Sequence, residues 1–437
     1  MRLGASIRTW RTRNRIVLVA LVAIAVALAV VFLRSGERKG TRYWFDDHTY
    51  HFEALRALQY APFKAADANE VLTAIANTTE GDNESWYRSW YQMAQIVERM
   101  AGSYREKSDQ AYALLRAHNY YRTAEYFLRG DDPRRKDTWQ RQIGHFEQAL
   151  TLLGVRRETF RIPYQGKQLK AVFYPAEGEL DLSKPLIVGI TGWDGTIEEK
   201  YFSLVPAATR RGYNVLVYEG PGQGSVLREQ GLLFTHQWHQ PNSAVLDYFV
   251  GRYGKPGKIV LVGTSLGAIL AMQAAAKDRR IDGVVAYDVM FDALEIGTAH
   301  VPGPVTWLYR NGHRNVLNFL LRQSAKVDPM IAWGLDHSRW TMGIQDETGS
   351  LDALRNYHLR DAIGEITCDV LLMEGALDHF LMVSDQRGQA KRGLKNARSV
   401  SEVVFKSGEG GEEHCRIGAI LQLQAELFRW IDAKFGA

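Results

Sequence analysis

A glycine-flanked serine marks the position in this sequence where a nucleophile is expected. Ser265 lies in the pentapeptide GTSLG, residues 263–267, between the apolar run KIVLVG and the helix-like stretch LGAILAMQAAAKD. A strand entering, a serine in a tight turn, small flanking residues and a helix leaving are the parts of a nucleophile elbow. Because the leaving helix presents its first N–H groups to the hydroxyl, the amide of Leu266 is the expected oxyanion donor. The pattern predicts a serine that attacks a carbonyl carbon.

A serine hydroxyl needs a general base, and that base needs a carboxylate to orient it. Downstream of such an elbow the acid comes first and the histidine last. His414, in GEGGEEHCRIGA after the last apolar run, is the predicted base, and Asp378, in GALDHF after the run DVLLME, is the predicted acid. His379 is a rival to His414, but it neighbours the acid and is expected to line the pocket or to face solvent. Asp288 and Asp292, which follow the run DGVVAY, stay open as alternative acids.

The second oxyanion donor is expected from the loop TGWDGTIEEKY, which follows the apolar run PLIVGI. The N–H of Gly192 or of Trp193 is the candidate donor, and the Trp193 ring is also a candidate pocket wall. The segment GPGQG at 220–224 lacks the Lys-Ser/Thr ending of a P-loop, so we interpret it as a tight turn beside the site. His236 and His239 have no third ligand or HExxH pattern, and two cysteines cannot form a four-thiolate zinc site. Neither a metal nor a cofactor is therefore expected.

Two kinds of sequence pattern divide the chain that carries these residues. From 48 to 154, apolar and aromatic residues recur at spacings of three and four, which predicts an all-helical cap domain. From 155 to 437, a hairpin pattern around Gln165-Gly166 precedes short apolar runs separated by helical stretches. This order is typical of a mostly parallel sheet with the α/β-hydrolase fold. Residues 293–365 are too long for a plain connection, so we interpret them as a lid insertion.

The N-terminal segment has a different character. Residues 1–15 are basic, residues 16–33 (IVLVALVAIAVALAVVFL) contain no polar side chain, and residues 34–47 form a linker. A helix over 16–33 would be about 27 Å long, close to the hydrocarbon thickness of a bilayer. The run is longer than the apolar core of a signal peptide, so it predicts one transmembrane helix and a membrane location. Basic residues flank both ends almost equally, and the side on which the catalytic domain lies stays open.

The net charge of +5 belongs to this segment. Residues 1–42 hold nine of the 54 Lys and Arg residues and one of the 49 Asp and Glu residues, which leaves 45 basic and 48 acidic residues elsewhere. A body with a net charge of −3 and no basic stripe argues against nucleic acid as a partner. The chain is 46% hydrophobic and 24% charged, which is an ordinary globular composition and excludes disorder as the main state.

Several segments taken together resemble a known group of enzymes. SWYRSWYQMA, AHNYYRTAEYFL, TGWDGTIEE, GPGQG, GTSLG, GALDHF and EEHC resemble segments of the α/β-hydrolases grouped with the fermentation/respiration switch protein and 2,6-dihydroxypseudooxynicotine hydrolase, and they are similar to those of fungal polyketide-shortening hydrolases. The resemblance covers roughly residue 48 to the C-terminus. It implies a serine hydrolase with a helical N-terminal cap, and some members of the group cleave a carbon–carbon bond beside a ketone.

The resemblance also assigns residues. It implies that Ser265 is the nucleophile, with the predicted acid and base in their usual places, and it puts Tyr120 and Arg122 of the NYYR segment near the pocket. The stretch YDVMFDA falls where C–C hydrolases of this group have an additional pocket carboxylate, so Asp288 or Asp292 is a candidate to assist proton transfer. Thr191-Gly192 departs from the Gly-Gly that members often have, and the predicted anchor departs from their mostly soluble character.

These features predict a membrane-anchored serine hydrolase. Its expected substrate is a small molecule of middle size, aromatic or amphipathic, that carries an ester, an amide or a ketone-adjacent C–C bond. The alternative is a catalytically idle hydrolase fold that serves as a membrane-tethered binding protein, and an intact serine, acid and histidine in the right order argues against it. The substrate, the cleaved bond and the oligomeric state stay open.

Overall fold

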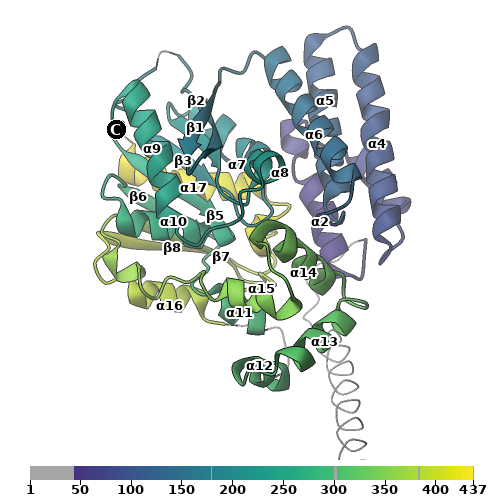
Figure 1. The fold of residues 1–437 in the computed structure, drawn as a ribbon. Helices are drawn as coiled ribbons and strands as arrows, with labels where there is room; N and C mark the ends of the chain where they lie inside the picture. Colours follow the sequence, from purple (N-terminus) through teal and green to yellow (C-terminus); the bar gives the residue numbers. More distant parts are fainter. Residues whose placement is uncertain (1–43, 179, 300–302, 382–383, 437) are drawn as a thin grey trace, which may run out of the picture.

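The computed structural model describes residues 44–178, 180–299, 303–381 and 384–436, in which a helical part lies beside a part built on a sheet (Figure 1). The helical part comes first in the chain. Its elements are α2 (His48–Leu58), the 3-10 helix η1 (Ala61–Phe63), α3 (Ala68–Ala76), α4 (Asn83–Ser103), α5 (Lys107–Glu125) and α6 (Arg134–Leu152).

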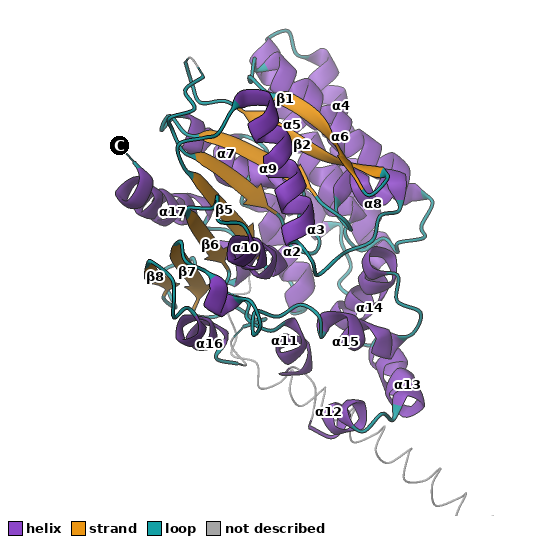
Figure 2. Cartoon of the chain, turned by 60° about the vertical axis from the view of Figure 1, so that its left-hand side comes forward, coloured by secondary structure: helices purple, strands orange, loops and turns teal. Residues whose placement is uncertain are grey.

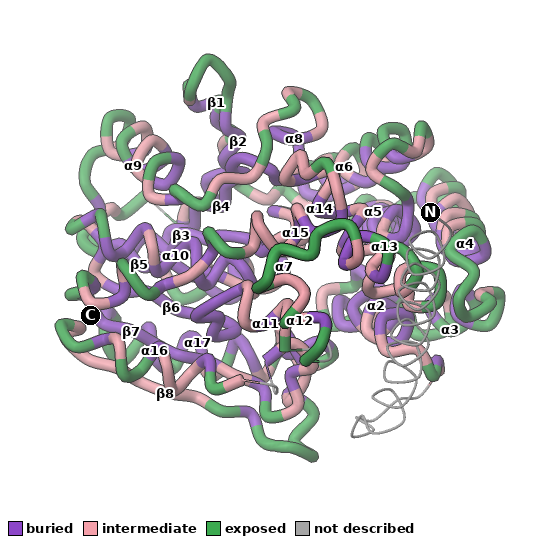
Figure 3. The backbone as a smooth tube through the Cα atoms, turned by 60° about the horizontal axis from the view of Figure 1, so that its bottom comes forward, coloured by how far each residue is buried: buried purple, intermediate pink, exposed green. Residues whose placement is uncertain are grey.

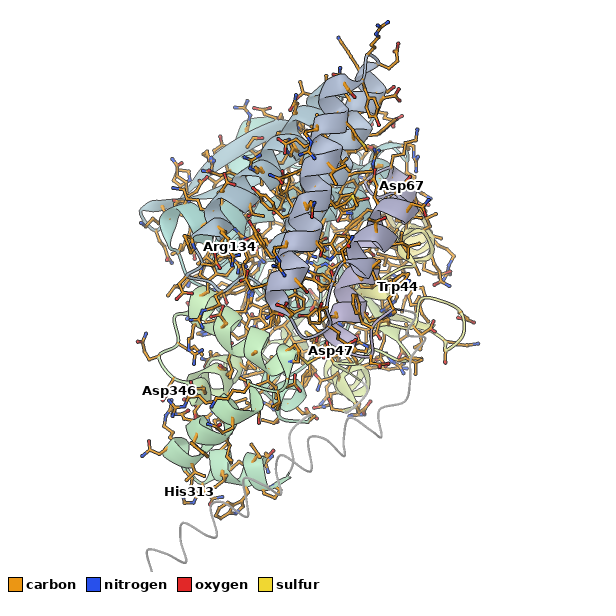
Figure 4. All side chains as sticks on the ribbon, turned by 90° about the vertical axis from the view of Figure 1, so that its right-hand side faces the viewer. Trp44, Asp47, Asp67, Arg134, His313 and Asp346 are labelled. Atoms are coloured by element: carbon orange, nitrogen blue, oxygen red, sulfur yellow. The ribbon has the colours of Figure 1, made fainter. Side chains whose placement is uncertain are left out.

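Local sequence signals explain where these helices begin and which face they bury. Asp47 and Asp67, both labelled in Figure 4, are the N-caps of α2 and α3, and their carboxylates accept backbone N–H bonds from the first turn. In α4, Trp86, Trp90 and Val97 recur at the helical spacing and are fully buried. Such a stripe needs a partner surface, and α5 supplies it.

The sheet has eight strands in the described residues, in the order β1-β2-β4-β3-β5-β6-β7-β8. The pairs β1–β2 and β2–β4 are antiparallel and the other pairs are parallel, which confirms the predicted hairpin followed by a parallel sheet. The strands are β1 (Glu158–Tyr164), β2 (Lys167–Tyr174), β3 (Leu186–Ile190), β4 (Asn214–Glu219), β5 (Ile259–Thr264), β6 (Gly283–Tyr287), β7 (Asp369–Gly375) and β8 (Ser399–Phe405).

Helices cover both faces of the sheet (Figure 2). Strand β4 illustrates this, because Val215 and Val217 join one apolar core and Leu216 joins the other. The first core also holds residues of the helical part, of α7 and of α17, whereas the second holds residues of α9 and α10. Burial on both faces explains the uninterrupted apolar runs (Figure 3). The helices are α7 (Ile197–Thr209), α8 (Gly224–Gln230), α9 (His239–Tyr253), α10 (Leu266–Lys277), α16 (Gln386–Gly393), η3 (His414–Arg416) and α17 (Ile420–Phe435).

A helical insertion separates β6 from β7. It consists of α11 (Ala293–Ala299), α12 (Gly303–Arg310), α13 (Arg314–Ser324), α14 (Pro329–Met342), α15 (Glu347–Leu354) and η2 (Ile363–Glu365). His313 and Asp346, the N-caps of α13 and α15, lie below the helical part in Figure 4. The insertion contacts the helical part where the Trp333 ring stacks on Tyr126 at 5.1 Å and Asp336 accepts the Gly130 N–H. The cap and the insertion therefore meet.

The predicted transmembrane segment, residues 16–33, and its basic flank, residues 1–15, lie outside the described residues. Among the helices of the described ranges, none has both the length and the apolar character that a bilayer crossing requires. The anchor stays a prediction.

Candidate active site

Ser265 occupies a sharp turn between β5 and α10. Its φ of +57° and ψ of −128° belong to the left-handed side of backbone space, which few non-glycine residues adopt. The flanking glycines make room for this turn. A Cβ on Gly263 would lie 2.0 Å from the Gly267 carbonyl oxygen, and a Cβ on Gly267 would lie 2.5 Å from that of Thr191. The GxSxG spacing is therefore a packing requirement as well as a motif.

The structure brings Ser265, His414 and Asp378 into one hydrogen-bonded chain. His414 Nε2 lies 3.0 Å from Ser265 Oγ, and His414 Nδ1 lies 2.7 Å from Asp378 Oδ2. Asp378 Oδ1 accepts the N–H groups of Phe380 and Leu381 at 2.9 and 3.2 Å, which fixes the carboxylate. These distances suit transfer of the serine proton to the imidazole.

Asp288 is a second carboxylate at the same imidazole. Its Oδ2 lies 3.2 Å from His414 Nδ1 and accepts the Cys415 N–H at 2.5 Å, and its Oδ1 pairs with the buried Arg416 guanidinium. Burial disfavours the charged imidazole, but Asp378 and Cys415 together outweigh burial, and the pKa of His414 lies well above its ordinary value. The site therefore stabilises the imidazolium that forms when His414 takes a proton.

The loop after β3 lies directly against the elbow. A Cβ on Gly192 would lie 3.1 Å from Ser265 Cβ, so only glycine allows this approach without a shift. The Gln223 amide donates to the carbonyls of Thr191 and Gly192 at 3.1 and 3.0 Å, which fixes the loop from behind. Gln223 belongs to the GPGQG segment, so this segment holds the loop after β3 in place through the Gln223 side chain. Leu266, as the first residue of α10, has an N–H without an intrahelical acceptor, as an oxyanion donor requires.

A cavity of about 260 Å³ opens beside Ser265. Its walls come from the cap, the insertion and the loops at the carboxyl ends of the strands. The Phe, Tyr, Trp and Met side chains that line it are those of Phe52, Tyr60, Tyr126, Trp193, Tyr287, Met290, Met330, Trp333 and Phe380. His379 and Trp193 line the cavity, and the indole N–H of Trp193 donates to Thr341 Oγ1 at 2.9 Å.

Two residues expected at the pocket, Tyr120 and Arg122, do not line this cavity. Tyr120 is fully buried inside the cap, where its hydroxyl donates to Glu70 and accepts the Asp67 N–H. Arg122 lines a smaller, adjoining cavity of about 40 Å³, which shares Tyr126 and Trp193 with the first, and it pairs with Glu53 at 2.6 Å. The cap does wall the cavity, but it does so with α2 and Tyr126. Tyr120 faces the bundle interior because α5 is the central helix between α4 and α6, whereas Arg122 points toward α2 and the loop after β3.

Asp292 is also absent from the cavity lining. Its carboxylate caps α11 by accepting the Glu295 N–H at 2.9 Å, and it pairs with Arg360. Of the two carboxylates after β6, only Asp288 reaches His414. His236 and His239 do not line the cavity either, and neither belongs to a group of potential metal ligands in the described residues.

Sequence reasoning missed a buried charge cluster between the cap and the site. Arg56 of α2 binds Glu199 through two hydrogen bonds of 2.8 Å and donates to Asp194 at 2.6 Å and to Glu53 at 3.1 Å. Burial opposes the charge of Asp194, but Arg56 and Arg122 together outweigh burial. The pKa of the Asp194 carboxyl therefore lies below its usual range. Asp194 follows Trp193 directly, so the cluster ties the oxyanion loop to the cap.

Replacement of Arg56 by methionine is expected to lower the free energy of unfolding by about 3 to 5 kcal/mol, because it leaves the buried Glu199 carboxylate without its main partner and leaves Glu53 paired with Arg122 alone. Urea denaturation measures this loss. Tyr120→Phe is the matched control inside the cap, since it removes one hydroxyl and is expected to cost about 1 kcal/mol and to leave kcat/KM unchanged. An Arg56→Met protein as stable as the wild type would mean that the cluster does not hold the cap in place.

Lys200 is a second buried charge that the sequence did not reveal. It lies on α7, lines the cavity and is 4% exposed, and its ammonium group contacts Thr264 Oγ1 and, at 3.4 Å, the Val262 carbonyl oxygen. No carboxylate of the described residues forms an ion pair with it. Burial lowers the pKa of Lys200 to about 7.

This pKa predicts a stability difference that depends on pH. Between pH 7 and the ordinary lysine pKa, the unfolded chain holds a proton on Lys200 that the folded chain has lost, so stability rises with pH. From pH 7 to pH 9 the wild type is expected to gain about 2 kcal/mol relative to Lys200→Met, in which this proton is absent. Denaturation of both proteins at both pH values tests this, and a constant difference would contradict it.

Comparisons with known proteins agree with this geometry. The model of the alpha/beta hydrolase family matches residues 187–416. Hydrolase acrC of Aspergillus aculeatus is 30% identical over 417 residues, which cover 88% of this chain and 96% of that protein. The 20-hydroxy-prefusarin hydrolase FUS2 of Gibberella moniliformis is 29% identical over 411 residues, covering 90% and 97%.

Solved structures give the same fold. The crystal structure of 2,6-dihydroxy-pseudo-oxynicotine hydrolase superposes with a TM-score of 0.67 at 17% identity and covers 87% of this chain and 95% of its own. The structure of AbyA5 superposes with a TM-score of 0.51, also at 17% identity. The likeness to the first structure extends over the cap as well as the sheet, since it includes most of the chain. This protein is an enzyme of the hydrolase class, and the chain belongs to the alpha/beta hydrolase family.

Proposed function

We propose that this hydrolase uses Ser265 as a nucleophile to cleave an ester, an amide or a ketone-adjacent C–C bond of a small molecule. The observation that carries the proposal is the unbroken chain from Ser265 Oγ through His414 to Asp378, with contacts of 3.0 and 2.7 Å. A protein that served only for binding would not need this arrangement at the floor of its cavity.

The chemistry follows from the positions of these groups. His414 takes the Ser265 proton as Oγ attacks the carbonyl carbon, and the N–H of Leu266, with that of Gly192 or Trp193, stabilises the oxyanion. His414 then gives the proton to the leaving oxygen, nitrogen or carbon. An acyl group remains on Ser265, and water that His414 activates releases it as a carboxylic acid. Asp378 and Asp288 stabilise the imidazolium in both steps.

The cavity supports a substrate of middle size with an aromatic or apolar body. Its volume of about 260 Å³ and its aromatic walls favour such a molecule. Two of the similar proteins are named for hydroxylated substrates, 20-hydroxy-prefusarin and 2,6-dihydroxy-pseudo-oxynicotine. These names support a hydroxylated substrate here, and the Arg56 guanidinium and the Lys200 amine on the wall provide polar groups for its hydroxyl groups.

A substrate panel tests this proposal. We expect the purified protein to turn over at least one class among aryl esters, anilides and aryl β-diketones, with release of a carboxylic acid detected by mass spectrometry. Turnover must disappear in Ser265→Ala. Absence of turnover across all three classes by folded protein would favour the binding-protein alternative.

We further propose that residues 16–33 anchor the enzyme in a membrane. The support is the run of apolar residues between two basic segments. Deletion of residues 1–34 is expected to move the protein from the membrane fraction to the supernatant with its kcat/KM intact. A truncated, folded protein that still sediments with membranes in high salt would contradict the proposal.

A further inference from the structure

Three side chains from distant parts of the chain meet beside the candidate triad. His48 Nε2 lies 3.0 Å from Glu413 Oε2, and His379 Nδ1 lies 2.8 Å from Glu413 Oε1. The two imidazole rings are 4.1 Å apart between centroids. We call this group of His48, His379 and Glu413 the two-histidine cluster. Its three ligand atoms all lie within 4.8 Å of one another.

The donor set and its geometry suit a divalent transition metal. Two imidazoles and one carboxylate form a common three-ligand set for zinc, which leaves a fourth position for water. Each imidazole contacts a different oxygen of the Glu413 carboxylate, so an ion between the two rings would be within reach of all three residues. The side chains of the three residues are 14 to 20% exposed, so an ion can reach them from solvent.

A second observation concerns the free nitrogen of His48. Its Nδ1 is buried and has no hydrogen-bond partner among the described residues. A metal on Nε2 requires the ring proton to be on Nδ1, and no hydrogen-bond donor of the described residues points at Nδ1 to oppose this tautomer. The Phe52 and Phe380 rings pack beside the histidine rings and form an apolar surround. The ring of His48 is therefore positioned by Glu413 and by aromatic packing, as a ligand would be.

The cluster also joins the cap to the candidate triad. His48 begins α2, His379 follows Asp378, and Glu413 precedes His414. Glu413 Oε1 already accepts the N–H groups of His379 and His414 at 3.2 and 2.7 Å. An ion bound here would link α2 to the two loops that carry the acid and the base.

We propose that the two-histidine cluster binds one divalent transition-metal ion of the zinc type, and that this ion fastens the cap helix α2 to the loops of Asp378 and His414. The inference concerns binding and stability, and it does not depend on which bond the enzyme cleaves. It adds a metal site to a protein whose sequence gave no reason to expect one.

Metal titration of the full-length chain tests the proposal. The protein is purified without a histidine tag, stripped with a chelator, and titrated with Zn²⁺ against a chromophoric competitor and with Co²⁺ by visible absorption. We expect one ion per chain, the intense cobalt bands of a tetrahedral site, and a higher Tm with Zn²⁺. His48→Gln and His379→Gln are each expected to weaken Zn²⁺ binding by about tenfold or more.

His145→Gln is the matched control, because His145 also lies near a glutamate, with Nε2 3.5 Å from Glu98 Oε1, but belongs to no group of three potential metal ligands among the described residues. It should bind Zn²⁺ like the wild type. Circular dichroism checks that each variant is folded, and Glu413→Gln provides a third ligand change should one histidine variant unfold. Absence of one-to-one binding, or equal affinity in folded His48→Gln, His379→Gln and His145→Gln, would overturn the proposal.

Discussion

Replacement of Ser265 by alanine is expected to lower kcat/KM by about 10⁴-fold or more and to leave the free energy of unfolding nearly unchanged. The loss is large because the serine oxygen, which lies 3.0 Å from His414 Nε2, is the nucleophile that His414 activates, and without it only the oxyanion donors and substrate binding still accelerate the reaction. Stability is preserved because alanine keeps the Cβ and therefore meets the same backbone constraint at φ +57°. Steady-state kinetics on the best substrate of the panel, with denaturation curves, measure both quantities.

Ser203→Ala is the matched control for this experiment. Ser203 also lines the cavity, but its hydroxyl donates to the Lys200 carbonyl oxygen and makes no contact with His414. It should keep most of the activity. If Ser265→Ala retained the activity of Ser203→Ala, Ser265 would not be the nucleophile.

Removal of the Asp378 charge and removal of the Asp288 charge are expected to have different effects on kcat/KM and on the free energy of unfolding. Asp378→Asn should lower kcat/KM by about 10³ to 10⁴-fold, because an amide at 2.7 Å from Nδ1 favours the wrong imidazole tautomer. Asp288→Asn should have a smaller effect on kcat/KM but lower the free energy of unfolding by about 3 to 5 kcal/mol. The reason is Arg416, which is fully buried and whose ion pair is with Asp288.

Kinetics and urea denaturation of the two variants separate these roles. Both substitutions are isosteric, so each serves as the control for the other. A larger catalytic loss in Asp288→Asn than in Asp378→Asn, among folded protein, would reverse the assignment of acid and supporting carboxylate. The sequence predicts Asp378 as the acid and leaves Asp288 and Asp292 as alternatives.

The sheet and the elbow could be predicted because their signals are local. Each parallel strand buried on both faces leaves a continuous apolar run, and the predicted run KIVLVG differs from β5 by one residue at each end. The serine turn requires glycine at positions 263 and 267, because backbone atoms lie within 2.5 Å of the place that a Cβ would occupy there. This requirement produces the fixed spacing of the motif. Asp378 and His414 follow their strands at the positions that this fold provides.

The cap side of the site could not be predicted because its contacts are distant in sequence. His48 and Glu413 are 365 residues apart, and Arg56 and Glu199 are 143 apart. A lone arginine or histidine on an amphipathic helix gives no sign of its partner. The NYYR segment misled for the related reason that α5 has buried residues around most of its surface, so its sequence does not say which side faces the cavity.

Reaction with a fluorophosphonate probe tests the central claim most directly. The probe phosphonylates a serine only where a base activates its hydroxyl and an oxyanion site accepts the phosphoryl oxygen. Peptide mass spectrometry of the labelled wild type is expected to find one adduct, on Ser265, and none in Ser265→Ala, with slow labelling in Asp378→Asn. An adduct on another residue, or no adduct on folded wild-type protein, would contradict the assignment of Ser265, His414 and Asp378 as the catalytic triad.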